Sequence, residues 1–217
     1  MRTAFEHELE QLEADMLQMG ATVEKALSDS MDAIFSHDDA LADAVIDGDD
    51  IVDQADFDVE KKCMRLLALQ QPLARDLRLV GSTLKIVTDL ERIGDNAVDI
   101  AKTAKRLNAL PLMKPYQHLP KMIDLVKSML HDMLEAFAAK DVDAARAIGA
   151  RDAEVDSLYG FILNETYALM EANHLVIRQG IGIVAVVRYL ERTADHVTNI
   201  GERIVYIQTG DWEDLNG

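Results

Sequence analysis

One acidic motif occurs twice in this sequence, and the repetition constrains the fold more than any other feature. Residues 89–101 and 189–201 both contain Leu-Glu-Arg-x-x-Asp, followed four residues later by an aspartate or an asparagine and then by isoleucine. The two copies lie 100 residues apart, while Asp53 and Asp156 repeat at an offset of 103. Duplication therefore extends beyond the motif, which is typical of a helical unit repeated in tandem.

The residue content and its periodicity favour helices in both halves. Only four prolines occur in 217 residues and aromatic residues make up 5%, while the chain is rich in alanine, leucine and methionine. Apolar residues recur at steps of three and four between Leu9 and Ile34, as on one face of a helix. The pattern predicts six helices, at about Thr3–Phe35, 36–70, Leu73–Leu107, Leu119–Ala139, 141–172 and, after a turn at 174–179, up to Gln208.

Turn signals divide this helical chain into two halves. Pro111, Pro115 and Pro120 mark a linker, so we place a boundary near residue 112, giving repeats 1–111 and 112–217. Asp38 and Asp141 are predicted N-caps, Gly48 a site of local kinking, and 210–217 a frayed tail. The predicted fold class is all-α, with two tandem antiparallel three-helix bundles.

The repeated motif places carboxylates on one face of a helix. Positions i, i+4 and i+8 stack one turn above the next, and each pair of like charges costs a few tenths of a kcal/mol. A basic partner or a bound cation must offset this repulsion. The preceding helix of each half offers a matching acidic ridge, and oxygen ligands suit Mg, Mn, Ca or Fe(II). The candidate metal ligands are Asp49, Asp53, Glu91, Asp95 and Asp99 in the first half, and Asp152, Asp156, Glu191, Asp195 and Asn199 in the second.

A solvated acidic face is the alternative reading of the same ridges. Arg92 and Arg192 directly follow the motif glutamates, so we expect them to point elsewhere and to pair across a helix interface. His196 is expected to be a surface or core residue, not a ligand. Glu171-x-x-His174 matches half of a di-iron carboxylate motif, but the sequence has no second such pair.

Charge and hydropathy exclude several function classes. A net charge of −17 argues against nucleic acid as a partner and is compatible with cations or a basic protein surface. The apolar run 183–187 is too short to span a bilayer, and the acidic N-terminus is no signal peptide, so we expect a cytoplasmic protein. The single cysteine, Cys63, is expected to fill the core. The sequence contains no phosphate loop, nucleophile elbow or nucleotide fingerprint.

Several motifs together resemble the PhoU family, the accessory proteins of bacterial high-affinity phosphate transport. They are Gln71-Pro72 followed by Asp76-Leu77-Arg78, Lys85-Ile86, the run from Asp89 to Asp95, and the second copy from Leu190 to His196 with Asn199-Ile200. The resemblance covers nearly the whole chain. It implies two three-helix bundles whose Glu-x-x-x-Asp motifs bind metal ions such as Fe, Zn, Mn or Mg. The second copy departs from the first where Asn199 stands opposite Asp99, so the two sites should differ in charge.

The same resemblance implies a regulator and not an enzyme. Proteins of this family are thought to link the transporter ATPase subunit PstB to the sensor kinase PhoR, repressing the phosphate response when phosphate is plentiful. We therefore expect a metal-binding adaptor, a homodimer that associates peripherally with the inner membrane through protein partners and does not insert into it. Two alternatives stay open at the level of sequence: a carboxylate-bridged metalloenzyme, and a helical scaffold without metal.

Overall fold

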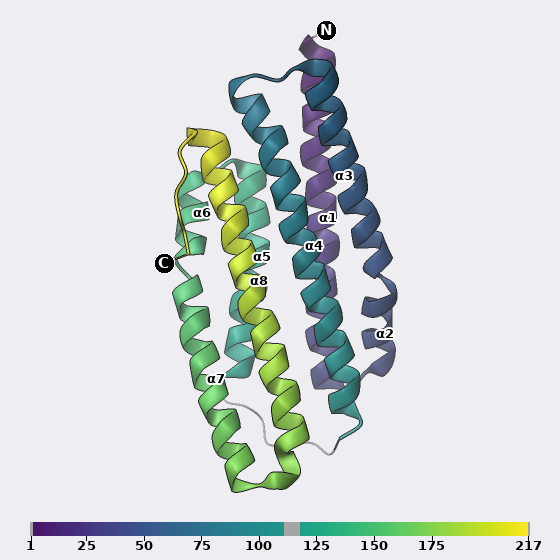
Figure 1. Cartoon of the computed structure of the whole chain (residues 1–217), viewed down its shortest axis with the longest axis vertical. Coiled ribbons are helices and arrows are strands. Elements are labelled where there is room, and N and C mark those ends of the chain that lie inside the picture. The colour runs from purple at the N-terminus through teal and green to yellow at the C-terminus, as the bar shows by residue number, and fades with distance from the viewer. Residues whose placement is uncertain (1, 111–117, 217) are drawn as a thin grey trace.

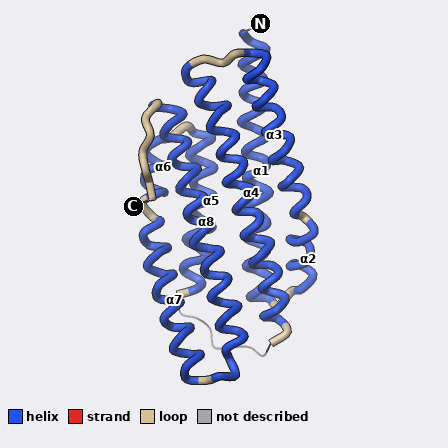
Figure 2. The backbone as a smooth tube through the Cα atoms, in the orientation of Figure 1, coloured by secondary structure: helices blue, strands red, loops and turns tan. Residues whose placement is uncertain are grey.

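The computed structural model of this chain describes residues 2–110 and 118–216, and almost all of them lie in helices (Figure 2). In chain order the elements are α1 (Arg2–Ser36), α2 (Asp39–Asp47), α3 (Asp49–Gln70), α4 (Ala74–Asn108), α5 (Leu119–Ala139), α6 (Val142–Gly149), α7 (Asp152–Ala172), the 3₁₀ turn η1 (His174–Val176) and α8 (Ile177–Thr209). No strand occurs in these two ranges. The predicted all-α fold class is confirmed.

Two three-helix bundles lie side by side. Helix α1, the broken pair α2–α3 and helix α4 form the first bundle, while α5, the broken pair α6–α7 and α8 form the second. Figure 1 shows α4 and α8 adjacent and antiparallel in the middle of the molecule, with α3 on one side and α7 on the other. The α3–α4 and α7–α8 turns therefore lie at opposite ends (Figure 1).

The buried side chains of both bundles form one continuous apolar core. Leu12 of α1, Leu90 of α4, Val126 of α5 and Leu190 of α8 belong to the same cluster, and each of them is fully buried. The periodic apolar stripes therefore face not only the helices of their own repeat but also those of the other. Burial across the boundary between repeats couples the stability of one bundle to that of the other.

Polar contacts also join the repeats along the contact between α4 and α8, which we call the α4–α8 seam. The amide Nδ2 of the buried Asn96 donates to Thr193 Oγ1 at 3.3 Å. At one end of the seam, Arg78 donates from Nε and Nη2 to the carbonyl oxygen of Ile207, at 3.2 and 3.0 Å. This carbonyl lies in the last turn of α8, where helix carbonyls lack intrahelical partners, so Arg78 completes that helix end.

Two turn predictions are confirmed. The Asp38 carboxylate accepts hydrogen bonds from the backbone N–H groups of Ala40 and Leu41, and the Asp141 carboxylate accepts one from Ala144. Both aspartates therefore cap the helix that follows, as their repeat-equivalent positions predict. The predicted boundary at residue 112 lies in 111–117, outside the described residues, as do Pro111 and Pro115; Pro120 lies in the first turn of α5.

Each second helix of a repeat is broken into two pieces. The expected kink at Gly48 is a full interruption, because α2 ends at Asp47 and α3 begins at Asp49. A single helix over 141–172 was the wrong prediction, since α6 ends at Gly149 and α7 begins at Asp152. Between them, Arg151 donates from Nη1 to Asp132 of α5 at 2.6 Å. A contact between helices therefore accompanies the missed break, and local periodicity does not encode such contacts.

The expectation of a frayed tail was also wrong. Trp212 stacks on Tyr206 with ring centroids 4.5 Å apart, and Glu213 accepts hydrogen bonds from Arg146 Nε and Nη2 at 2.8 and 2.6 Å. These contacts hold residues after α8 against the second bundle. A polar composition predicts exposure, but Trp212, Glu213 and the backbone N–H of Leu215, which donates to Glu202 Oε1 at 3.2 Å, all contact the second bundle.

Candidate metal centres

The first acidic cluster lies where α3 faces α4. It comprises Asp49, Asp53 and Asp56 of α3 with Glu91 and Asp95 of α4. Burial, followed by the negative charge of Asp95, raises the pKa of Glu91 above its ordinary value, and the charges of Asp53 and Asp56 raise it further. Burial and the charges of Asp53 and Asp95 likewise raise the pKa of Asp49. The acids that the sequence placed on two ridges are therefore near enough to repel one another across the helix contact.

The oxygens of this cluster are poorly satisfied by the protein itself. Asp56 Oδ1 is buried and accepts no hydrogen bond within the described residues. Glu91 Oε2 is also buried without a hydrogen bond, and its nearest cation is Arg92 Nε at 3.3 Å. A buried carboxylate oxygen that lacks a donor costs stability unless a cation or a proton compensates it.

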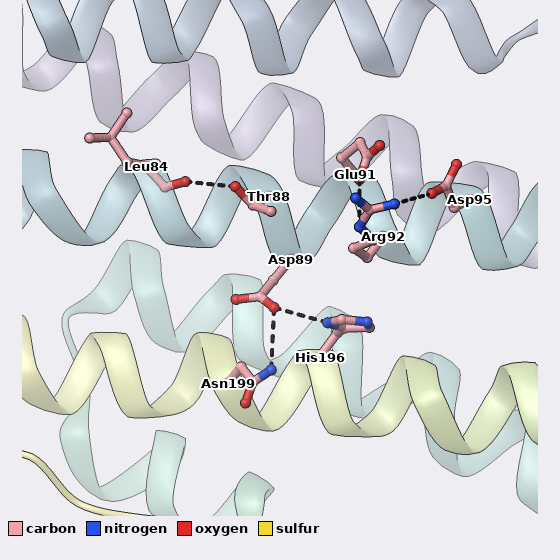
Figure 3. A network of polar contacts seen from close by, with 8 residues as sticks. All are labelled: Leu84, Thr88, Asp89, Glu91, Arg92, Asp95, His196 and Asn199. Carbon is pink, nitrogen blue, oxygen red and sulfur yellow. Dashed lines mark hydrogen bonds and ion pairs between the residues drawn. The ribbon is translucent and has the colours of Figure 1, made fainter.

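Arg92 supplies part of that compensation, so the expectation that it would point away was wrong. Besides its contact with Glu91, Arg92 Nη1 donates to Asp95 Oδ2 at 2.9 Å (Figure 3). The long side chain folds back along its own helix and reaches the residue before it and the one three positions on. Within the described ranges, Arg192 makes no equivalent ion pair or hydrogen bond. The two repeats therefore differ in how their acids are neutralised.

The second acidic cluster lies where α7 faces α8 and comprises Asp152, Asp156, Glu191 and Asp195. Asp152 is only 8% exposed, and burial, followed by the charges of Asp195, Asp156 and Glu191, raises its pKa to about 6. Burial and neighbouring acids also raise the pKa values of Glu191 and Asp195. Four sequence-predicted residues therefore converge in the second half as well.

Asp99 and Asn199 do not join these clusters. Asp99 forms a hydrogen bond with Tyr189 of α8 and lies 3.7 Å from Lys102 Nζ. Asn199 donates from Nδ2 to Asp89 Oδ1 at 3.3 Å (Figure 3). Both residues therefore face the α4–α8 seam, although helical stacking placed them on the same ridge as the motif acids.

The seam also contains a contact that the sequence did not predict. His196 Nδ1 lies 2.9 Å from Asp89 Oδ1, with side chains 20% and 15% exposed respectively, so the histidine binds across the two repeats (Figure 3). The repeat could not predict this contact, because the equivalent residue of the first copy, Asn96, pairs with Thr193 instead. His196 therefore lies at the interface between the repeats.

The ligand chemistry of the two clusters suits a hard cation, but their side chains are not arranged around a single ion position. Among residues 2–110 and 118–216, no three acidic, histidine or cysteine side chains are arranged as a finished metal cage. The donors are nevertheless all carboxylate oxygens, several with raised pKa values, and a buried Asp56 oxygen lacks a donor. Rotation of these side chains toward one ion would supply the oxygen ligands that Mg, Mn or Ca prefers.

The buried Asp152 predicts a measurable pH dependence. The pKa of Asp152 in the folded state, about 6, exceeds the ordinary value of 3.8. The contribution of this group to the free energy of unfolding is therefore complete below pH 3.8 and is lost as the pH rises through 6. Asp152→Asn keeps the neutral form at every pH. In chelator we expect it to raise the free energy of unfolding at pH 7 by about 1–2 kcal/mol, after subtracting the lost charge at the start of α7.

Urea unfolding of the wild type and the variant at several pH values between 3.5 and 7.5 measures this difference. The gain should vanish near pH 3.5, and the same change at the exposed Asp58 should show no comparable pH dependence. A gain that stays constant across the range would show that the Asp152 charge is not the cause.

The fold and its two clusters define a class: a tandem repeat of three-helix bundles with one partly buried acidic cluster in each repeat. A family model described as the PhoU domain matches residues 16–104 and 119–204. The chain belongs to the PhoU family. It is 42% identical to the phosphate-specific transport system accessory protein PhoU homolog of Clostridium acetobutylicum, over 99% of both chains, and 37% identical to the homolog from Streptococcus pneumoniae, over the full length of both.

Solved structures agree with this assignment. The crystal structure of the phosphate transport system regulatory protein PhoU from Streptococcus pneumoniae superposes with a TM-score of 0.90, at 34% identity, covering 97% of this chain and 99% of that one. The crystal structure of PhoU from Pseudomonas aeruginosa gives a TM-score of 0.92 at 36% identity, covering 95% of this chain and all of that one. The predicted two-bundle architecture is thus the architecture of the family.

Proposed function

We propose that this protein is a metal-binding regulatory accessory protein of a phosphate-specific transport system. The observation that carries the proposal is the full-length similarity to proteins named as accessory and regulatory components of such systems. The two acidic clusters support the metal-binding part, because each brings several carboxylates from two helices close together, and a bound cation would offset their repulsion. Fe, Zn, Mn or Mg are the candidate ions, held by Glu91 and Asp95 with α3 acids in one repeat, and by Glu191 and Asp195 with α7 acids in the other.

The role that we assign to the protein is a signalling adaptor, not an enzyme. It acts by contact with the transporter ATPase subunit PstB and the sensor kinase PhoR, and represses the phosphate-starvation response when phosphate is plentiful. The metals supply fixed positive charge on an acidic surface, which would locally reverse the charge that a partner meets. A cytoplasmic homodimer, held at the inner membrane by its partners, is the working form in this proposal.

Membrane association through proteins is consistent with the helices described above. None of them, within the described ranges, combines the length and apolar character required to cross a bilayer. The net charge of −17 also disfavours direct binding to anionic lipid, since both surfaces are negative. In this proposal a protein partner attaches the chain to the membrane.

Co-purification tests the proposal. A tagged copy is expected to retain PstB and PhoR from detergent-solubilised membranes of phosphate-replete cells, and to lose both when the transporter and kinase genes are deleted. The matched control is the same tag on pure anionic liposomes, where we expect no retention. Equal retention on liposomes would contradict the proposal and indicate a lipid-binding protein.

A further inference from the structure

A polar cavity of about 190 Å³ lies on the α4–α8 seam and shares Asp95 with the first acidic cluster. Three cationic side chains line it, Arg92 and Lys102 from α4 and Arg192 from α8, together with the amide of Asn96 and the carboxylates of Asp95 and Asp99. Arg92 and Arg192 occupy equivalent positions of the two repeats, so the antiparallel packing of α4 and α8 brings both guanidinium groups to one cavity.

The three cations differ in how firmly they are held. Arg192 makes no hydrogen bond or ion pair within residues 2–110 and 118–216, and Lys102 lies 3.7 Å from Asp99, beyond hydrogen-bond distance. Arg92 is held by Glu91 and Asp95, both of the first acidic cluster. In this state the carboxylates lining the cavity largely cancel its positive charge.

Arg92 and a metal ion would compete for the negative charge of Glu91 and Asp95. A divalent ion on Glu91 and Asp95 would weaken their attraction for the guanidinium, because the ion neutralises the two carboxylates and repels the like-charged Arg92 side chain. The displaced Arg92 side chain is 52% exposed and already lines the cavity, so it is free to turn into it. The metal would at the same time neutralise Asp95, which leaves an excess of positive charge in the cavity.

We propose that this cavity is a binding site for a tetrahedral oxyanion of the inorganic phosphate class, strengthened when metal occupies the first acidic cluster. Guanidinium groups donate paired hydrogen bonds that match the oxygens of such an ion, and two of them converge here with an ammonium and a buried amide. A water molecule occupies about 30 Å³ of liquid, so the cavity has room for a phosphate ion and bridging waters.

The coupling makes this site a sensor within the proposed function, on which it rests. Because linkage between two ligands is reciprocal, phosphate in the cavity would retain Arg92 there and so strengthen metal binding at the first cluster. A metal-loaded, phosphate-bound state and an empty state then differ in the charge of the exposed α4–α8 seam. A partner protein that contacts the seam could distinguish the two states by this difference in charge.

Phosphate titration by calorimetry tests the site in the full chain, in a buffer free of other oxyanions. The background variant Glu191→Gln/Asp195→Asn removes the second cluster, so that Mn²⁺ binds only at the first. We expect phosphate to bind about tenfold more tightly at saturating Mn²⁺ than in chelator, within the usual range of coupling between sites. Equal phosphate affinity in the two conditions, or no phosphate binding in either, would overturn the proposal.

Two variants separate the cavity from phosphate that simply coordinates the metal. In the same background, Arg192→Ala should weaken phosphate binding at least tenfold and leave Mn²⁺ affinity without phosphate unchanged, whereas Arg188→Ala, an exposed arginine of the same helix outside the cavity, should change neither. Phosphate affinity unaffected by Arg192→Ala would place the anion on the metal and refute the cavity.

Arg92→Gln gives the sharper signature, because its two effects have opposite signs. Loss of the competing guanidinium should tighten Mn²⁺ binding, measured by the magnetic resonance signal of the free ion, while loss of a donor should weaken phosphate binding. A structural role would weaken both, and that result would count against the proposal. Failure of Mn²⁺ to bind the first cluster at all would instead refute the metal part of the proposed function, and the metal dependence with it.

Discussion

Replacing Leu90 by alanine is expected to lower the free energy of unfolding by about 2–5 kcal/mol and to destabilise both bundles together. Leu90 is fully buried in α4 and belongs to the core cluster that contains residues of every long helix. Truncation removes its apolar surface from the core and leaves a cavity that the rigid helices around it cannot fill. Because that core continues into the second bundle, the loss should not be confined to the first.

The chain contains a natural reporter for this effect. Trp212 is the single tryptophan, and it contacts Tyr206 and Arg203 of α8, in the repeat that does not contain Leu90. Denaturant unfolding followed by Trp212 fluorescence and by circular dichroism should give one coincident transition in the wild type, and the same shift by both probes in Leu90→Ala.

Leu73→Ala is the matched control, since Leu73 is 78% exposed and its truncation should change stability by less than about 0.5 kcal/mol. If the fluorescence transition of Leu90→Ala stayed at the wild-type midpoint while circular dichroism shifted, the repeats would unfold independently. The two halves of the continuous core would then unfold as separate cooperative units.

Local pattern was sufficient for the helices but not for how they pack. The apolar period and turn residues predicted Leu119–Ala139 as observed, and the other five helices to within a few residues apart from the unpredicted break at 150–151. Periodicity identifies the face that must be buried, but not the helix that buries it. Leu90 and Leu190 mark such faces in equivalent positions, yet only the folded chain shows that α4 and α8 pack against each other.

The candidate site, like the fold, was predictable from local sequence but not in its contacts between helices. Helical spacing and the repeat identified the acids that converge in each cluster, because both depend on one backbone geometry. The same spacing misplaced Asp99 and Asn199, which contact Tyr189 and Asp89 across the seam. The spacing also predicted the wrong direction for the Arg92 side chain. A flexible side chain can pair with any of several nearby acids, and charges on another helix influence which pair forms.

The double variant Glu91→Ala/Asp95→Ala is expected to lose metal binding in the first repeat and to keep its helical structure. Both carboxylates belong to the first cluster, and their removal leaves only the α3 acids, so the site loses every ligand that α4 contributes. In the wild type, metal at a hundredfold excess over its dissociation constant should add about 2.7 kcal/mol for each site. The variant should therefore lose one bound ion in elemental analysis and this share of the metal-induced rise in thermal stability.

The metal-free protein should respond to the same change in a different direction. Removing Glu91 relieves a buried carboxylate whose pKa is raised, and alanine favours the helix, while the ion pairs lost by the exposed Arg92 are worth less than about 1 kcal/mol. In chelator we therefore expect the variant to be as stable as the wild type or slightly more stable. The matched variant Glu191→Ala/Asp195→Ala should remove the other ion and leave the first. If either variant bound the wild-type number of ions with unchanged affinity, the carboxylates of that repeat would be a solvated face and not ligands.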